Sequence, residues 1–378
     1  MNPDPETRTF LIAGPVRIHP RFLRAMSFPS VNHRGDYFHG VVHEIRELLP
    51  VMFGTKGHQA VLTGSGTAGL EALYSGLLKN GERTLVLSNG NFGERTDQIA
   101  RRYSDRVTTL TAPWGRHIPV DAAIAEIEKG DLRAVCVVLN ETSVGLANDL
   151  SKIAPAVRKS GALFLVDAIS AIAGIPCPIA EWGLDGVVAG SQKGLAAPAG
   201  LAMVHLSDRA RSQLHPGTFY LDLIAHLDSL EKDDTPYTPA VPLFLALHEA
   251  LLLLKEETLE GRLARTHRLA EATRAAADAI GLELFPERAH ASDTVTAIKN
   301  PEGMDDKLVR KALLDRYNVE VQGGQGALKG KIFRIGHMGI ADWPDLLVAF
   351  AGLERILAKA GKLAHPGASL SALAERMP

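Results

Sequence analysis

The sequence predicts an α/β protein with two domains: a large domain whose mostly parallel sheet is covered by helices on both faces, and a smaller C-terminal α+β domain. Three observations support this expectation. The chain has 378 residues, which exceeds the usual size of a single core. Between residues 59 and 204, short β-branched runs alternate with longer helical patterns. After residue 281 the pattern changes to short strand-like pieces interleaved with helices.

The predicted large domain, residues 1–256, comprises an N-terminal segment and a series of βα units. Alternation of buried strands with helices is typical of parallel sheets, whose ligands lie at the carboxyl ends of the strands. Residues directly after each strand are therefore the first to inspect for chemistry. The predicted strands are Ala60–Thr63, Thr84–Leu87, Ala134–Leu139, Leu163–Val166, Gly186–Ala189 and Leu201–His205.

The predicted small domain comprises residues 257–378. Apolar residues at helical spacing between Leu243 and Ile280 indicate one or two long helices that lead out of the large domain. The last dozen residues are expected to form a loosely held tail. The remaining pieces are the strands Thr294–Ile298, Val319–Gln322 and Ile332–Ile335, with helices over Asp305–Asp315 and Pro344–Ala360.

Composition argues for small-molecule ligands and against nucleic acid or membrane partners. Charged residues make up 22% of the chain and the net charge is −2, so no long-range attraction to an anionic polymer or surface is expected. The longest apolar run, Val241–Leu254, is interrupted by His248 and Glu249 and is too short to span a bilayer. Residues 1–7 are polar and lack the features of a secretory signal.

The two cysteines favour a reducing cytoplasmic location. Cys136 and Cys177 both lie in apolar runs, so neither a disulfide framework nor a paired-cysteine metal site is available. No bound metal is expected.

A glycine-rich loop, TGSGTAG at residues 63–69, lies between a predicted strand and a predicted helix. Its glycines let backbone N–H groups approach an anion, and the helix start adds partial positive charge, so a phosphate site is favoured. The same letters spell the dinucleotide fingerprint G-x-G-x-x-G. That alternative requires an acid at the end of the next strand, but the next strand ends in Leu87-Ser88-Asn89. A plain tight turn is the third interpretation.

Two charged residues follow neighbouring predicted strands. Asp167 ends an apolar strand, where a carboxylate is costly unless it meets a cation such as a pyridinium nitrogen; capping the next turn is the alternative. Lys193 follows the next strand within Gly190-Ser191-Gln192-Lys193-Gly194. In a tight site its pKa can fall, which frees the amine to attack an aldehyde, whereas the alternative is a structural or surface lysine. Their separation of 26 positions corresponds to one βα step, so both side chains can reach one ligand.

The order of these motifs resembles that of fold-type I pyridoxal phosphate enzymes, specifically the class V aminotransferases near alanine–glyoxylate and serine–pyruvate aminotransferases. The resemblance covers nearly the whole chain. Its motifs are Ala13-Gly14-Pro15, Asn32-His33-Arg34, Gly64-Ser65-Gly66, Glu141-Thr142-Ser143-Val144-Gly145, Phe219-Tyr220-Leu221-Asp222, Tyr237 and Arg334-Ile335-Gly336, together with Asp167 and Ser191-Gln192-Lys193-Gly194.

The resemblance implies a role for each matched residue. Lys193 would be the Schiff-base lysine and proton carrier, and Asp167 the partner of the pyridinium nitrogen. Phe92 and Ile169 would pack on opposite faces of the ring, and Thr142 would hydrogen-bond the ring hydroxyl. The implied phosphate ligands are Ser65, Gly66, Thr67 and Gln192.

The resemblance also implies a substrate side and a second subunit. Arg334 would bind the substrate α-carboxylate, since its planar fork suits a carboxylate; a structural ion pair is the alternative. Gly14, His33 and Arg34 would complete the substrate site. Tyr237 would reach the phosphate of the neighbouring subunit, so a homodimer with its active site at the subunit interface is expected. The sequence departs from the family at Ala240, where relatives commonly have a phosphate-binding threonine, so either Thr238 takes its place or one hydrogen bond to the phosphate is missing.

The implied function is ping-pong transfer of an amino group from alanine or serine to glyoxylate or pyruvate. Alternatives are the same chemistry with aspartate, pyridoxamine or an aminophosphonate as donor, and a pyridoxal phosphate lyase or desulfurase. A cysteine desulfurase needs a cysteine on a mobile loop, and neither cysteine of this chain is so placed. A nicotinamide-dependent oxidoreductase and a non-catalytic binding protein are the rivals from other classes.

Overall fold

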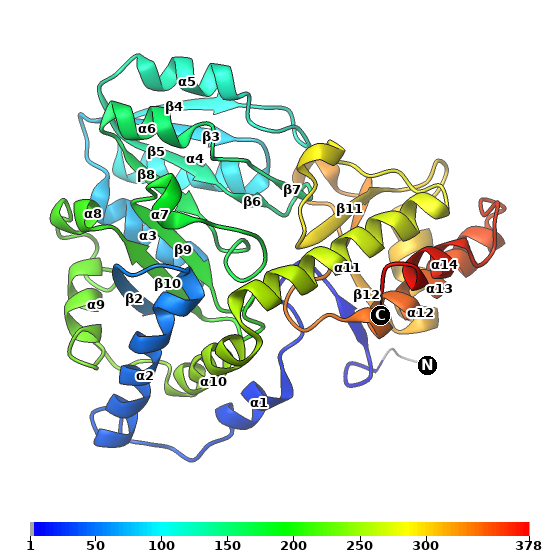
Figure 1. Ribbon diagram of the computed structural model, residues 1–378, viewed down its shortest axis with the longest axis horizontal. Coiled ribbons are helices and arrows are strands. Elements are labelled where there is room, and N and C mark those ends of the chain that lie inside the picture. Colours follow the sequence, from blue (N-terminus) through cyan, green and yellow to red (C-terminus); the bar gives the residue numbers. More distant parts are fainter. Residues whose placement is uncertain (1–3, 378) are drawn as a thin grey trace.

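The computed structural model of the protein describes residues 4–377, and its largest element is a seven-stranded sheet (Figure 1). The strand order is β2-β10-β9-β8-β5-β3-β4. β10 is antiparallel to both its neighbours and the other pairs are parallel, so the expected mostly parallel sheet is confirmed. The strands are β2 (His58–Thr63), β3 (Arg83–Ser88), β4 (Arg106–Thr111), β5 (Leu132–Val138), β8 (Leu163–Asp167), β9 (Gly186–Gly190) and β10 (Leu201–Leu206).

All six strands predicted for this sheet are present, and the edge strand β4 was missed. Its side chains are partly or fully exposed and three of its six residues are threonine, so it lacks the apolar run by which the buried strands were predicted. Edge strands often carry such polar side chains because they face solvent.

Helices cover both faces of the sheet, as predicted. Alternate residues of β5 point to opposite faces: Val135 and Val137 join one apolar core, and Ala134 and Cys136 join the other. The first core also holds buried residues of α2 (Asp36–Phe53), α5 (Val120–Glu128), α6 (Ala154–Ser160) and α10 (Val241–Glu257). The second holds those of α3 (Gly66–Leu77), α4 (Asn91–Tyr103), α8 (Asp208–Ser212) and α9 (Leu223–Leu230). The short helices α1 (Pro20–Met26) and α7 (Ile179–Trp182) complete this part of the chain.

A second sheet of four strands has the order β1-β12-β13-β11. Three of its strands match the predicted C-terminal strands: β11 (Val295–Lys299), β12 (Val319–Gly323) and β13 (Ile332–Gly336). The fourth, β1 (Thr9–Leu11), comes from the N-terminal segment and pairs in parallel with β12 (Figure 1). The division into residues 1–256 and 257–378 stays a prediction, and this pairing shows that the N-terminal segment contributes to the sheet of the C-terminal residues.

Two long helices link the sheets. α10 ends at Glu257 and α11 (Leu259–Ala279) begins after Thr258, which adopts a positive φ of 64°. In Figure 1 α11 runs from the large sheet towards the second sheet, where α13 (Trp343–Lys359) also packs. Within residues 4–377, no helix combines the length and the apolar character needed to cross a membrane.

Two expectations for the C-terminal residues need correction. The segment predicted as one helix over Asp305–Asp315 is helical, but it begins as a π-helical turn, Lys307–Lys311, that continues into α12 (Ala312–Tyr317). The loosely held tail is wrong, because α14 (Ala368–Ala374) packs against α11 and α13 and buries Ser369 and Leu373. The carboxylate of Glu354 fixes the start of α14 by accepting hydrogen bonds from Gly367 N at 2.6 Å and Ser369 N at 2.8 Å.

Candidate functional site

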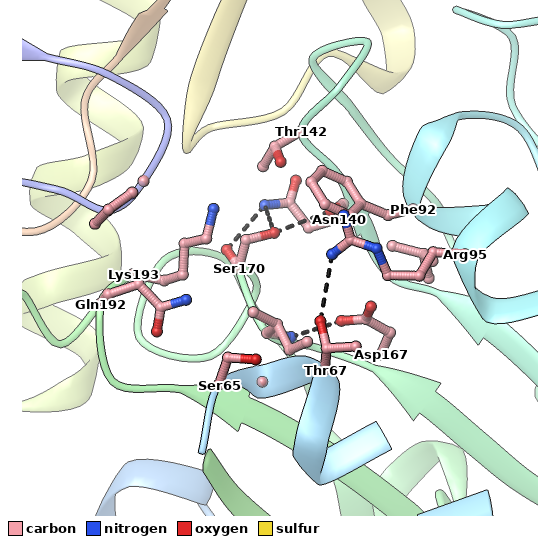
Figure 2. Close-up of a pocket in the computed structure, with 15 residues that line it drawn as sticks. Ser65, Thr67, Phe92, Arg95, Asn140, Thr142, Asp167, Ser170, Gln192 and Lys193 are labelled. Atoms are coloured by element: carbon pink, nitrogen blue, oxygen red, sulfur yellow. Dashed lines mark hydrogen bonds between the residues drawn. The ribbon is translucent and has the colours of Figure 1, made fainter. Parts of the chain in front are cut away.

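A cavity of about 300 Å³ opens at the carboxyl ends of β5, β8 and β9 (Figure 2). This volume lies at the lower end of the range for small-molecule sites, and the position is where parallel sheets bind ligands. Ten of the residues predicted from the sequence line it. The lining residues are Gly14, Pro15, Ser65, Gly66, Thr67, Phe92, Arg95, Val138, Asn140, Thr142, Asp167, Ile169, Ser170, Gln192 and Lys193.

The glycine-rich loop forms the start of α3 on one side of the cavity. Ser65 is the N-cap residue, and its hydroxyl makes no capping hydrogen bond. The N–H groups of Gly66 and Thr67 belong to the first helical turn, where no preceding carbonyl can accept them. Gly66 is required by close packing, since a Cβ there would lie 2.6 Å from Ile169 Cδ1. Together with the helix dipole these groups suit a phosphate.

Asp167 lies at the end of β8 and is 5% exposed. Its carboxylate accepts a hydrogen bond from Ile169 N at 2.9 Å. Burial raises the pKa of Asp167 to about 6, although that hydrogen bond and the charges of Arg95 and Lys193 oppose the rise. A carboxylate that is desolvated to this degree gains from a nearby cation, so the protonated ring nitrogen of pyridoxal phosphate fits here.

Lys193 lies in the loop after β9 and is 8% exposed. Its Nζ donates a hydrogen bond to Ala13 O at 2.7 Å. Burial lowers the pKa of Lys193 to about 8, and the charge of Arg334 adds to the decrease, whereas Asp167 opposes it. A neutral, nucleophilic amine is therefore accessible near neutral pH.

Gly14 makes room for this lysine. Its φ is +105°, and a Cβ there would lie 2.5 Å from both Cδ and Nζ of Lys193. The backbone at Gly14 therefore forms the wall along which the lysine side chain runs.

Gln192, the neighbour of Lys193, also faces the cavity (Figure 2). Its side-chain Oε1 is buried and, among the described residues, has no hydrogen-bond partner. A buried polar atom without a partner is costly, and a ligand in the cavity would remove that cost.

Three polar or charged lining residues, Arg95, Asn140 and Ser170, were missed by the sequence analysis. Arg95 places its guanidinium 4.9 Å from the centre of the Phe92 ring and donates to Thr67 Oγ1 at 3.4 Å. Asn140 donates to Ser170 O at 2.8 Å and so joins two walls of the cavity. Asn140 follows β5 and Arg95 lies one helical turn after Phe92, so the strand-end rule and helical spacing were the available signals.

Arg334 lies next to the cavity without lining it. It is 1% exposed on β13, and it donates to Thr142 O at 2.8 Å and to Gly323 O at 2.7 Å. Burial lowers the pKa of Arg334 to about 10, while the nearby carboxyl group of Glu141 opposes this shift. The guanidinium is therefore charged at neutral pH and touches the same loop that carries Thr142.

The predicted residues His33, Arg34 and Tyr237 do not line the cavity of this chain. Arg34 instead pairs with the carboxylate of Asp234. Tyr237 donates from its hydroxyl to Phe219 O at 2.9 Å. Their expected roles stay predictions.

The segment around the unusual Ala240 also lies outside the cavity. Ala240 N donates to Thr63 Oγ1 at 3.2 Å, and Thr238 is exposed.

Neither of the two thiols is expected to be reactive at neutral pH. Cys136 is buried in β5, and burial raises the pKa of Cys136 and of Cys177 to about 12. Thiolates are the reactive species, so neither residue suits sulfur transfer. Residues 4–377 contain no group of three or more side chains placed to hold a metal ion.

Comparison with known proteins supports the resemblance seen in the sequence. The family model for aminotransferase class-V matches residues 22–337. An uncharacterized aminotransferase of Methanocaldococcus jannaschii is 39% identical, with 96% of this chain and 95% of the relative covered. The serine–glyoxylate aminotransferase of Methylorubrum extorquens is 34% identical, with 97% of this chain and 95% of the relative covered.

A solved structure is similar over almost its full length. The crystal structure of ureidoglycine–glyoxylate aminotransferase from Bacillus subtilis has a TM-score of 0.93 to this chain at 33% identity, with 97% of each chain covered. The lysine, the strand-end carboxylate and the phosphate-type loop thus occur in a fold and a sequence that both match one family. The chain belongs to the class V aminotransferases, which are enzymes of fold type I that use pyridoxal 5′-phosphate.

Proposed function

We propose that the protein transfers an amino group from a small amino acid, alanine or serine, to glyoxylate or pyruvate by a ping-pong mechanism. The observation that carries the proposal is the convergence in one cavity of Lys193, whose pKa is lowered to about 8, and the buried carboxyl group of Asp167. Relatives named for serine and for ureidoglycine as donors both carry glyoxylate in their names, which favours glyoxylate as acceptor.

The cavity residues would hold the cofactor by its ring nitrogen, its ring hydroxyl, the two faces of its ring and its phosphate. When bound, the cofactor draws electrons from the Cα–H bond of an attached amino acid, provided that its ring nitrogen stays protonated. Asp167 would keep that proton in place, and Thr142 would bind the ring hydroxyl. Phe92 and Ile169 would pack on the two ring faces. The phosphate would be bound by Ser65, Gly66, Thr67 and Gln192.

Lys193 would serve twice. Its neutral amine would hold the cofactor, and once released by an incoming amino acid, the same amine would take the proton from Cα and return it on the other side of the transferred nitrogen. A pKa of about 8 is close to the optimum for a group that must both accept and donate a proton near neutral pH.

Arg334 would orient the substrate by its carboxylate. A guanidinium carries five N–H donors, and three of its bonds now go to the carbonyls of Gly323 and Thr142. The remaining donors, and the positive charge, are available to a substrate carboxylate that enters beside Thr142.

A homodimer is part of the proposal. Tyr237 stacks on Tyr220 with ring centres 5.5 Å apart, and the adjoining Phe219 is 83% exposed. A second subunit would cover this aromatic surface and could bring Tyr237 to its neighbour's cofactor phosphate. Two free thiols fit a reducing cytoplasm.

The test is the visible absorption of purified protein with pyridoxal phosphate, followed as alanine, serine, aspartate and pyridoxamine are added singly. The expected result is a coloured protein bleached by alanine or serine, whose colour returns with glyoxylate or pyruvate. Lys193→Ala should lose both covalent colour and turnover, and Lys152→Ala, at an exposed lysine, should lose neither. Bleaching by aspartate or pyridoxamine alone would replace the donor, and a wild-type protein that cannot take up the cofactor would refute the proposal.

A further inference from the structure

Glu141 fixes the start of α4 from a distant part of the chain. It is fully buried in β6 (Asn140–Glu141), which pairs with β7 (Leu146–Ala147) as a small hairpin. Its Oε2 accepts hydrogen bonds from Phe92 N at 3.0 Å and Gly93 N at 2.9 Å. These are the N2 and N3 positions of α4, whose N–H groups lack partners within the helix.

The same hairpin satisfies the remaining donor. Ser143 Oγ accepts from Asn91 N at 3.1 Å and itself donates to Glu141 Oε1, which also accepts from Ser143 N at 3.3 Å. The helix dipole favours a negative charge at this end. Burial raises the pKa of Glu141 to about 7 against the opposing effect of these donors, so the carboxylate is mostly ionised at pH 8.

The packing leaves no freedom around this carboxylate. A Cβ on Gly90 would lie 2.4 Å from Glu141 Cγ and 2.5 Å from its Cδ. The φ of Gly90 is −178°, an extended conformation open to any residue, so glycine is needed there for space alone.

The hairpin also contacts the substrate side of the cavity. Thr142, between Glu141 and Ser143, lines the cavity with its side chain and accepts a hydrogen bond from Arg334 Nη1 with its carbonyl oxygen. One short segment therefore touches Phe92 through α4 and Arg334 through a backbone carbonyl.

We infer that Glu141 is a positioning residue that keeps the ring of Phe92 and the guanidinium of Arg334 in register with the cofactor. The inference rests on the proposed function, which gives those two side chains their roles. Glu141 itself lines no part of the cavity, so it acts through the start of α4 and through the hairpin.

The test compares Glu141→Gln with Glu354→Gln at pH 8. Glu354 is also buried and caps α14 from another element in the same way, far from the cavity. Glu141→Gln removes the negative charge at the start of α4, and an amide oxygen that accepts from Phe92 N and Gly93 N leaves the amide N–H group facing Ser143 N, which is another donor, so the cap is weakened. Both variants should lose thermal stability. Glu141→Gln alone should raise the dissociation constant for pyridoxal phosphate about tenfold or more, which is ~1.4 kcal/mol.

Two further readouts separate positioning from folding. Glu141→Gln should weaken the circular dichroism of the bound cofactor and raise KM for glyoxylate more than it lowers kcat, whereas Glu354→Gln should do neither. If Glu141→Gln does not fold, Gly90→Ala, which displaces the carboxylate without removing it, takes its place with the same expected effects. If Glu141→Gln matches Glu354→Gln in cofactor affinity, circular dichroism and KM, the inference about Glu141 is wrong, while the proposed function is unaffected. A wild-type protein that binds no cofactor would refute the proposed function, and this inference with it.

Discussion

Replacing Asp167 with asparagine is expected to stabilise the protein without cofactor and to weaken cofactor binding. Burial raises the pKa of Asp167 from 3.8 to about 6. Because the folded state holds this proton more tightly than the unfolded chain does, the free energy of unfolding falls as pH rises through that interval. The shift of ~2 pH units corresponds to a cost of up to ~3 kcal/mol at pH 8, which falls to about 1.6 kcal/mol at pH 5, where the buried carboxyl is mostly protonated.

Urea unfolding of the apoprotein at these two pH values measures the effect. Asp167→Asn should be more stable than wild type by up to ~3 kcal/mol at pH 8, since the amide oxygen can still accept from Ile169 N, and by about half as much at pH 5. With pyridoxal phosphate bound the order should reverse, because only a carboxylate pairs with the protonated ring nitrogen.

The matched control is Asp185→Asn. Asp185 is equally buried, but it accepts hydrogen bonds from Phe164 N at 2.8 Å and Arg209 Nε at 3.0 Å. Removing this charge, whose partner Arg209 is 38% exposed, should destabilise the protein by ~1.5–3 kcal/mol, the opposite sign. Apoprotein of Asp167→Asn that is no more stable than wild type at pH 8 would refute the view that this charge is uncompensated before the cofactor binds.

Three further predictions concern the lysine and the substrate arginine. Cofactor attachment to the wild-type apoprotein should accelerate with pH up to about 8 and then level off, because only the neutral amine of Lys193 attacks the aldehyde. Stopped-flow absorbance measures this rate, and a rate that keeps rising to pH 10 would contradict the lowered pKa of Lys193. Gly14→Ala should slow the same step about tenfold or more, because its Cβ would lie 2.5 Å from Lys193 Nζ, and an unchanged rate would show that the lysine does not need this space. Arg334→Gln should raise KM for glyoxylate ~10–100-fold, as expected for a lost charged hydrogen bond. Steady-state kinetics tests this, with Arg316→Gln, at an exposed arginine of the same part of the chain, as the control. Equal effects of the two substitutions on KM would show that Arg334 does not bind the substrate.

The parts of the site that the sequence identified share one property. Asp167, Lys193 and the loop at residues 64–67 each follow a buried apolar strand. In a parallel sheet the carboxyl ends of such strands meet at one edge, so order along the chain is enough to bring these residues together. The fold class could also be predicted from the sequence, because the alternation of strands and helices is visible in the local pattern of apolar residues.

Contacts between segments far apart in the chain were decided only by the tertiary structure. The parallel pairing of β1 with β12 joins residues about 310 positions apart, and no local pattern in Thr9–Leu11 indicates which strand it will pair with. α14 was missed because its seven residues include only two large apolar side chains, Leu370 and Leu373, and such a short helix becomes stable only against α11 and the carboxylate of Glu354.

The sequence by itself determined the fold class and placed Lys193 and Asp167, the residues proposed to bind the cofactor, at the ends of neighbouring strands. The tertiary structure decided that Arg95 stacks on Phe92, that Arg334 reaches the hairpin loop, and that Glu141 caps α4. Each of the latter two contacts joins residues at least 48 positions apart through hydrogen bonds to backbone groups. Every residue carries the same backbone groups, so the amino-acid sequence contains no signal that marks which of them will be used.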